Sequence, residues 1–359
     1  MKLHIIGVPR NPSTPNIAMD PYAMVSYYLT TYLHRAGHEV HYYGFEESTV
    51  ECTSKWVCAN LEDHHKNNII NFEKNHWQQN HRWETEYSLR ALEFLKKNVK
   101  DNEIILCLWS TTVSCIKEPL DSLYNNLKIV DGHIGHRSPS LHTPFHVFAS
   151  YANRHVVYGM NNNREELSYW HDTVIYPMAN ELSNFTFKKE KKDYFLFMSR
   201  LNEDKGLGVF FDLASHFPNE KFILAGQGVH MRDVPDNVEE VGLLDPSERK
   251  KYLADAKAVI SPSHYPEPFG LTSIEAQLSG TPIICTDWGG FTESVIEGVT
   301  GFRCSYFNDF VNAVKNVSMI DPNECRKNGE KYVAESLIKD WEKYLHRIDR
   351  LHWYSLDEK

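Results

Sequence analysis

The sequence predicts an α/β protein made of two Rossmann-like domains that face a cleft. Short apolar runs alternate with amphipathic stretches of helix length, which is the pattern of parallel sheets flanked by helices. This series stops near residue 180 and then begins again. A length of 359 residues also suits two domains better than one. In such sheets a ligand binds at the carboxyl ends of the strands, so we expect the site there.

The first half predicts a βαβ unit. A strand at Leu3–Gly7 is followed by a Pro-, Ser- and Asn-rich loop, Pro9–Pro21, and by a helix at Tyr22–Arg35 that Gly37 stops. A second strand follows at Glu39–Tyr43. We predict a helix at Glu84–Lys97 and further strands at Ile104–Trp109, Lys128–Asp131, His155–Tyr158 and Val174–Pro177.

A basic polar segment without periodicity, Asn184–Lys192, separates the two halves. The second half predicts strands at Tyr194–Met198, Lys221–Ala225, Ala258–Ser261 and Pro282–Thr286. It predicts helices at Leu207–His216, Pro246–Asp255, Leu271–Ser279, Asn308–Val317, Cys325–Ile338 and Asp340–Leu351. We therefore expect an N-terminal domain of residues 1–183 and a C-terminal domain of residues 184–339.

Composition narrows the class of protein. Apolar residues make up 42% and charged residues 24% of the chain, which excludes disordered, collagen-like and coiled-coil proteins. A net charge of -10 argues against a nucleic-acid partner, because general nucleic-acid binders need a basic surface. No apolar run approaches the roughly 18 residues that span a membrane, which leaves only a peripheral membrane contact. A local basic pocket for a phosphate group remains compatible with this charge.

The cysteines and the N-terminus favour a cytoplasmic location. The seven cysteines are scattered and odd in number, as expected of reduced thiols. The apolar run Leu3–Val8 is too short for a signal peptide. The sequence does not indicate an oligomeric state.

The densest chemical signal is the segment Ser261–Ala276. A strand ends here, a loop turns, and a helix begins near Leu271, so free backbone N–H groups can meet an anion such as a diphosphate. Gly270 permits a close approach. Glu267 and Glu275, eight positions apart, can each accept hydrogen bonds from sugar or ribose hydroxyls. Alternatively, Glu267 caps the loop and Glu275 is a solvated helix residue.

A second signal is a pair of cations at a strand-to-helix turn. Arg200 and Lys205 flank this turn, again at a carboxyl edge, where two cations can stabilise a departing diphosphate. Alternatively, they pair with Glu203 and Asp204 as solvated loop charges.

Together these signals carry a family resemblance. The stretch Tyr194–Phe302 resembles the C-terminal half of the retaining nucleotide-sugar glycosyltransferases of GT-B fold, family 4. The matching pieces, in the family's order, are Ser199-Arg200 with Lys205-Gly206, Ile223–Gly228, Val241-Gly242, Glu267-x7-Glu275 with Gly280-Thr281-Pro282, Gly289–Glu293, and Gly298 with Gly301.

The resemblance implies a role for each matching residue. Arg200 and Lys205 bind the donor diphosphate, Glu275 binds the ribose, and Glu267 faces the donor sugar. The other implied donor contacts are Gly242 and Leu243 in the base-binding loop, and Phe269, Gly270, Leu271 and Thr272.

The N-terminal half resembles the family less closely. Lys128–His133 fits the strand that ends in a histidine near the reacting sugar, which implies a catalytic role for His133. His136 and His142 are alternatives, and we expect His136 on the acceptor side. The resemblance also implies that a helix within about residues 340–359 returns to the N-terminal domain.

The first loop departs from the family pattern. Family members usually have a Gly-Gly pair where this chain has Asp20-Pro21. Pro21 has no N–H to donate, and Asp20 would repel a phosphate. We expect Asp20 to contact an acceptor hydroxyl instead.

The implied reaction is transfer of a sugar from a nucleoside-diphosphate sugar, with UDP-glucose or GDP-mannose as the expected donor. The acceptor is a hydroxyl group, expected to belong to a glycan. We favour retention by front-face attack, with Arg200 and Lys205 holding the departing charge. The alternatives are a GT-B sugar-nucleotide epimerase, a phosphorylase, or a non-catalytic sugar-nucleotide-binding module.

We expect no metal and no cofactor. No two aspartates are separated by one residue, so the Asp-x-Asp pair of metal-dependent glycosyltransferases is absent from the sequence. The spacing of Cys52 and Cys58 is not one that zinc uses. No complete G-x-G-x-x-G is present, which argues against a dinucleotide oxidoreductase.

Overall fold

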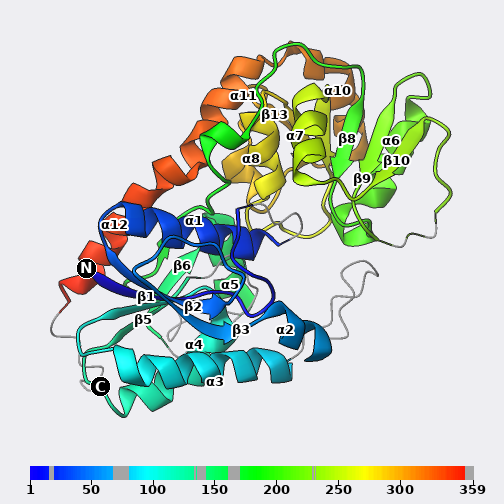
Figure 1. Ribbon diagram of the computed structural model, residues 1–359. Coiled ribbons are helices and arrows are strands. Elements are labelled where there is room, and N and C mark those ends of the chain that lie inside the picture. The colour runs from blue at the N-terminus through cyan, green and yellow to red at the C-terminus, as the bar shows by residue number, and fades with distance from the viewer. Residues whose placement is uncertain are drawn as a thin grey trace.

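The computed structural model describes residues 1–15, 20–67, 81–132, 135, 143–160, 170–228, 230 and 232–351. They form two α/β domains, each built on a parallel sheet with helices on its faces (Figure 1). The predicted fold class is confirmed.

The first sheet has seven strands in the order β3-β2-β1-β4-β5-β6-β7. Its strands are β1 Lys2–Ile6, β2 Glu39–Phe45, β3 Ser54–Ala59, β4 Ile104–Cys107, β5 Lys128–Asp131, β6 Phe145–Phe148 and β7 Thr173–Val174. Its helices are α1 Pro21–Arg35, α2 Leu61–Asn67, α3 His81–Asn98, α4 Ser110–Asp121 and α5 Tyr151–Met160. The strand order reverses between β1 and β4, and ligands bind beside such a switch point.

The second sheet repeats this topology in the order β10-β9-β8-β11-β12-β13. Its strands are β8 Phe195–Met198, β9 Phe222–Ala225, β10 Val238–Gly242, β11 Ala258–Ser261, β12 Ile283–Thr286 and β13 Gly301–Cys304. Its α-helices are α6 Leu207–His216, α7 Pro246–Asp255, α8 Leu271–Leu278, α9 Phe291–Ser294, α10 Phe307–Asn316 and α11 Pro322–Gly329. The switch point lies between β8 and β11, so both chemical signals of the sequence flank it.

Two crossings of the chain join the domains. The segment after β7 leads into the second domain, and α12, Ala334–Asp349, runs back along the first (Figure 1). Backbone hydrogen bonds tie the crossings together, from Ala179 N–H to the Tyr332 carbonyl at 2.9 Å and from Ala334 N–H to the Asn180 carbonyl at 3.0 Å. The apolar face of α12 belongs to the core that also holds α1. The predicted domain boundaries themselves stay a prediction.

One predicted strand is wrong. His155–Tyr158 lies inside α5, and the sheet position beside β5 belongs to β6 instead. A run of four apolar and aromatic residues does not distinguish a strand from a short helix by periodicity. The hydroxyl of Ser150 accepts the N–H of Asn153 at 2.9 Å and so begins the helix upstream of this run.

The predicted helix Cys325–Ile338 is two helices. α11 ends at Gly329, a 3-10 turn covers Glu330–Tyr332, and α12 begins at Ala334 rather than at residue 340. Val333 has an extended backbone, with φ -79° and ψ 161°, which breaks the helix. The break redirects the chain from the second domain to the first.

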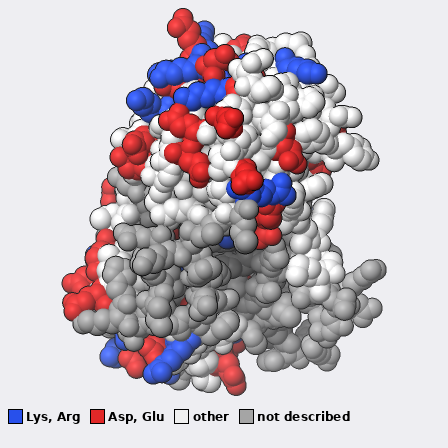
Figure 2. Space-filling model, turned by 90° about the vertical axis from the view of Figure 1, so that its right-hand side faces the viewer, with Lys and Arg blue, Asp and Glu red and all other residues white. Residues whose placement is uncertain are grey.

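On the face shown in Figure 2, charges of both signs are intermixed over the second domain, in the upper half of the view. All seven cysteines are free thiols.

Among the described residues, no helix is both long enough and apolar enough to cross a lipid bilayer.

Candidate active site

The turn after β8 carries the predicted cations. The side-chain oxygen of Asn202 accepts the Lys205 N–H at 3.2 Å and closes a short 3-10 turn, Glu203–Lys205. Gly206 follows with φ +76°, and a Cβ there would lie 1.9 Å from the Pro262 carbonyl oxygen. Only glycine fits this contact. The turn is therefore held directly against the loop that follows β11.

This contact brings Lys205 and Glu267 together. Nζ of Lys205 lies 2.5 Å from Oε1 of Glu267 and 2.6 Å from the hydroxyl of Tyr265. The Tyr265 hydroxyl donates to Oε2 of Glu267 at 2.9 Å, and the hydroxyl of Ser263 donates to Oε1 at 2.7 Å. Glu267 is only 7% exposed. Four polar side chains thus form one network at the carboxyl edge of the second sheet, and Lys205 is its cation.

Tyr265 is a functional candidate that the sequence analysis missed. Burial raises the pKa of its hydroxyl well above the ordinary value, and the Glu267 carboxylate raises it further, so the hydroxyl stays protonated. The charge of Arg200, which is exposed in the same region, acts in the opposite direction. A tyrosine two positions before Glu267 is a sequence signal that could have been weighed, but loop aromatics more often serve packing.

The structure differs from the alternative interpretations, in which Glu267 caps its loop and Lys205 pairs with Glu203 or Asp204 as a solvated charge. Lys205 is paired with Glu267, whereas Glu203 lies 3.1 Å from Arg232. Glu267 joins a buried network and does not cap its loop.

Two glycines hold the backbone around Glu267. The Gly290 N–H donates to the Glu267 carbonyl at 2.7 Å. A Cβ on Gly289 would lie 2.6 Å from the Glu267 nitrogen, and one on Gly290 would lie 2.3 Å from Cα of Phe269. The Gly-Gly pair of the sequence therefore serves close backbone packing, which fixes the segment that carries Glu267.

The start of α8 presents the next predicted contacts. Gly270 precedes the helix with φ +85°, and a Cβ there would lie 2.4 Å from the Phe291 ring. Leu271 and Thr272, in the first turn, are partly exposed. N–H groups in a first helical turn have no partner within the helix and favour an anion. The geometry thus suits an anionic ligand beside Lys205.

Glu275 is buried, in contrast to the alternative of a solvated residue. It lies one turn into α8 and is 5% exposed. Its Oε2 accepts a hydrogen bond from Arg249 of α7.

Gly242 and Leu243 lie at the end of β10, where both are exposed. Their predicted contact with the nucleotide base stays a prediction.

In the first domain, Asp20 caps α1. Its Oδ1 accepts the N–H groups of Tyr22 at 3.0 Å and Ala23 at 3.2 Å, and its Oδ2 accepts from the Asn11 side chain at 2.8 Å. The carboxylate thus occupies the helix start where a phosphate would otherwise bind. A contact between Asp20 and an acceptor hydroxyl stays a prediction.

An aromatic cluster beside Asp20 joins Trp109 to two side chains that were not predicted as site residues, Arg10 and Tyr22. The Arg10 guanidinium stacks 3.8 Å above the Trp109 ring, and Tyr22 meets Trp109 edge-on. Burial raises the pKa of Tyr22 to about 12, with Tyr265 and Glu267 among the groups that contribute. A Cβ on Gly135 would lie 3.9 Å from the Tyr22 hydroxyl and 2.7 Å from Cβ of Pro268, so Tyr22 is near the segment of the other domain that carries Glu267. Arg10 follows β1, so the switch-point rule could have found it.

The predicted histidines His133 and His136, and the alternative His142, lie outside the described residues. Within the described part of the chain, no group of three or more His, Cys, Asp or Glu side chains could hold a metal ion.

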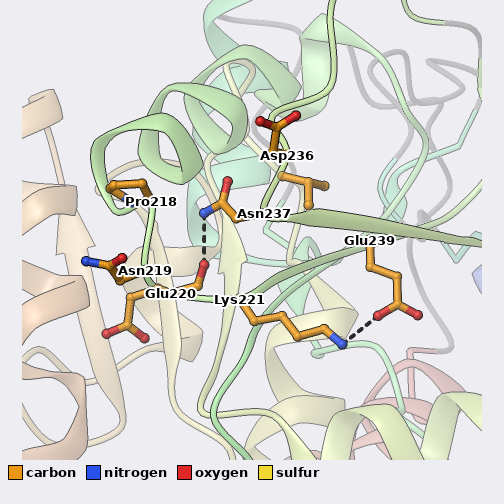
Figure 3. Close-up of a pocket in the computed structure, with 8 residues that line it drawn as sticks. Pro218, Asn219, Glu220, Lys221, Asp236, Asn237 and Glu239 are labelled. Atoms are coloured by element: carbon orange, nitrogen blue, oxygen red, sulfur yellow. Dashed lines mark hydrogen bonds and ion pairs between the residues drawn. The ribbon is translucent and has the colours of Figure 1, made fainter.

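A cavity of about 350 Å³ lies away from these residues, at the amino ends of β9 and β10 (Figure 3). Lys221 pairs with Glu239 at 2.6 Å, and the Asn237 amide donates to the Glu220 carbonyl at 2.8 Å. These groups satisfy one another at the sheet edge opposite the predicted site, so the cavity is not the candidate active site.

Residues 179–332 match the family described as glycosyl transferases group 1. The chain has a GT-B fold, and the family match covers less than half of it, mostly its second domain. A glycogen synthase of Mycobacterium tuberculosis is 34% identical over 160 residues. This match covers 41% of the chain and 38% of the synthase, so the chain aligns with less than half of that relative.

Several solved structures resemble almost the whole chain, among them the following two. AviGT4, a glycosyltransferase involved in avilamycin A biosynthesis, superposes with a TM-score of 0.71 at 18% identity, covering 97% of this chain and 98% of AviGT4. Anabaena HepE, solved in complex with UDP and glucose, superposes with a TM-score of 0.67 at 13% identity. The superposition covers 97% of this chain and 100% of HepE. At these identities the likeness concerns the fold of both domains, whereas the family match concerns residues 179–332.

Proposed function

We propose that this protein is a glycosyltransferase that moves a sugar from a nucleoside-diphosphate sugar to a hydroxyl acceptor. The observation that carries the proposal is the Lys205–Glu267 contact. Two segments 62 positions apart meet at the carboxyl edge of a group 1 domain. There they combine a cation for phosphate with a carboxylate for sugar hydroxyls.

Each residue of the proposed site has a distinct task. Arg200 and Lys205 hold the diphosphate, together with the N–H groups at the start of α8. Glu275 receives the ribose hydroxyls and exchanges its hydrogen bond from Arg249 for them. Glu267 faces the donor sugar. A bound diphosphate draws Lys205 away from Glu267, and the hydroxyls of Ser263 and Tyr265 remain to hold that carboxylate.

We propose UDP-glucose as the first donor to test and GDP-mannose as the second. The UDP and glucose bound to HepE, which shares the fold, support this order. A hydroxyl of a glycan is the proposed acceptor, in keeping with the relative named glycogen synthase.

The proposed transfer retains the anomeric configuration and needs no metal. The leaving phosphate takes the acceptor proton at the face where the acceptor attacks, while Arg200 and Lys205 stabilise the charge that develops on the phosphate. Proton NMR of the fresh product should show the donor's anomeric configuration. Activity should persist in EDTA. Activity that disappears with EDTA and returns with Mn²⁺ would contradict metal independence.

We propose that the enzyme works in the cytoplasm, where its seven free thiols remain reduced. Fractionation of cells of the source organism tests this directly, because a secreted pool would oppose it.

The experiment that tests the function is a screen of UDP-, GDP-, ADP- and dTDP-sugars by thermal shift and by slow hydrolysis. We expect stabilisation by one nucleotide class and slow release of its sugar. Binding to none of them contradicts the proposal. Conversion of a donor to its epimer, a requirement for free phosphate, or binding without any turnover would instead indicate an epimerase, a phosphorylase or a binding module.

A further inference from the structure

Glu293 of the second domain bonds directly to the first domain. Its Oε1 accepts the N–H of Ala152 at 2.7 Å, and its Oε2 accepts the N–H of Tyr151 at 3.0 Å and the Tyr176 hydroxyl at 3.1 Å. Tyr151 and Ala152 begin α5, so the carboxylate caps a helix of the other domain. A carboxylate is also favoured there by the helix dipole.

The same region of α5 touches the segment that carries Glu267. We define the donor loop as residues 263–270. The hydroxyl of Ser150, which accepts the Asn153 N–H, also donates to the Pro268 carbonyl at 2.6 Å. Pro268 follows Glu267 directly. One end of α5 thus holds both Glu293 and the donor loop.

Aromatic packing completes this junction. The Phe269 ring lies 5.2 Å from the Tyr176 ring and 5.3 Å from the Tyr332 ring, measured between centroids. The Tyr332 hydroxyl donates to the Glu293 backbone carbonyl at 3.1 Å. On its own side, Glu293 follows the Gly289-Gly290 pair that packs on the donor loop backbone. Of the partners of the Glu293 carboxylate, Tyr176 packs on Phe269 of the donor loop, and Tyr151 and Ala152 directly follow Ser150, which bonds to Pro268.

We propose that Glu293 is a positioning residue that couples the donor loop to the first domain. Because Glu293 fixes the start of α5 against the donor loop, it determines the position of Glu267 relative to Tyr22 and to the acceptor side. The part of the inference that concerns turnover rests on the proposed function. The mechanical coupling does not, because it follows from contacts between the domains.

The main test is Glu293→Gln. Glutamine keeps the size of the side chain but leaves one acceptor oxygen in place of two, and its amide cannot accept the second backbone N–H. Tyr176→Phe is the milder variant, since it removes one hydrogen bond and keeps the ring against Phe269. Glu324→Gln is the matched control, because the Glu324 side chain on α11 is 46% exposed and pairs only with Lys327 among the ion pairs of the described residues.

Hydrogen exchange measures the coupling. In Glu293→Gln we expect exchange to rise about tenfold in peptides covering 145–160 and also in those covering 263–270, the effect of losing one charge-assisted hydrogen bond. Tyr176→Phe should show a smaller rise in both, and Glu324→Gln none. A rise confined to 145–160 would mean that Glu293 only caps α5, which overturns the proposal. If Glu293→Gln does not fold, Tyr176→Phe decides by the same criterion.

Turnover separates positioning from binding. With UDP-glucose as the probe, kcat for hydrolysis should fall about tenfold in Glu293→Gln, while KM and the Kd for UDP stay within about twofold. A lower UDP affinity with unchanged kcat would contradict a positioning role. If the unmodified protein hydrolyses neither UDP-glucose nor GDP-mannose, the proposed function fails, and the exchange experiment still decides the coupling.

Discussion

Nζ of Lys205 lies 2.5 Å from Oε1 of Glu267, although the two residues come from opposite sides of the β8–β11 switch point. The cation expected for the diphosphate is therefore paired with the carboxylate expected for the sugar. Under the proposed function, donor binding exchanges this pair for two contacts with the donor.

Lys205→Ala should weaken nucleotide binding and lower stability. We expect UDP affinity to fall at least tenfold, because a charge-assisted hydrogen bond contributes about 1.5–3 kcal/mol. The melting temperature should also fall, since Glu267 loses its cation while it stays buried. Calorimetric titration and thermal denaturation measure the two effects. Lys189→Ala, at an exposed lysine of the segment before β8, should change neither.

Tyr265→Phe should separate turnover from binding. The Lys205–Glu267 pair survives this change, but Glu267 loses one of the two hydroxyl donors that would hold it once Lys205 turns to the ligand. We expect UDP affinity within about threefold and a kcat for donor hydrolysis about tenfold lower, as one hydrogen bond to a charged group predicts. Equal losses of kcat and affinity would show that the hydroxyl serves ground-state binding instead.

Gly206→Ala should be strongly destabilising. Gly206 and Gly298 both have a positive φ, but an added Cβ at Gly206 would lie 1.9 Å from a carbonyl oxygen, and one at Gly298 meets no atom within 4 Å. Gly206→Ala should therefore reduce the free energy of unfolding by at least about 2 kcal/mol more than Gly298→Ala. Urea denaturation of both variants provides the comparison. Equal losses would mean that the β8 turn is not held against Pro262.

Stability should fall as the pH drops from about 6.5 towards 4. Burial lowers the pKa of His4 to about 4, against the opposing effect of Glu103. Between these values the unfolded chain binds a proton that the folded protein does not, so acid favours unfolding by up to about 1.4 kcal/mol per pH unit. Burial also lowers the pKa values of His38 and His171, in the same direction.

Urea denaturation at pH 7 and pH 5 measures this dependence. His4→Asn should flatten the change of stability with pH, whereas His216→Gln, at an exposed position of α6, should leave it unaltered. A protein equally stable at both pH values would contradict the buried, neutral state of His4.

The architecture was predictable because alternating strands and helices restrict the chain to parallel sheets. The positions of Arg200, Lys205, Glu267 and Gly270 at the carboxyl edge followed from the same rule. β10 escaped prediction because Val238–Gly242 is a partly exposed edge strand with two central glutamates. The run His155–Tyr158 was misassigned because a helix start upstream decided its conformation.

The partners of each site residue could not be predicted. Ion pairing of Glu267 with Lys205, and of Glu275 with Arg249, depends on which loops the sheet order brings together. The contact of Glu293 with α5 depends further on how the two domains pack. These contacts join residues 62, 26 and 141 positions apart, beyond the range over which local sequence patterns carry information.

The most direct measurement of the central claim is calorimetric titration of UDP and GDP into the unmodified protein, Arg200→Ala and Glu275→Ala. We predict that one nucleotide binds and that each substitution weakens it about tenfold or more, with unchanged secondary structure by circular dichroism. Unchanged affinity in both variants would contradict the site described at the β8–β11 switch point.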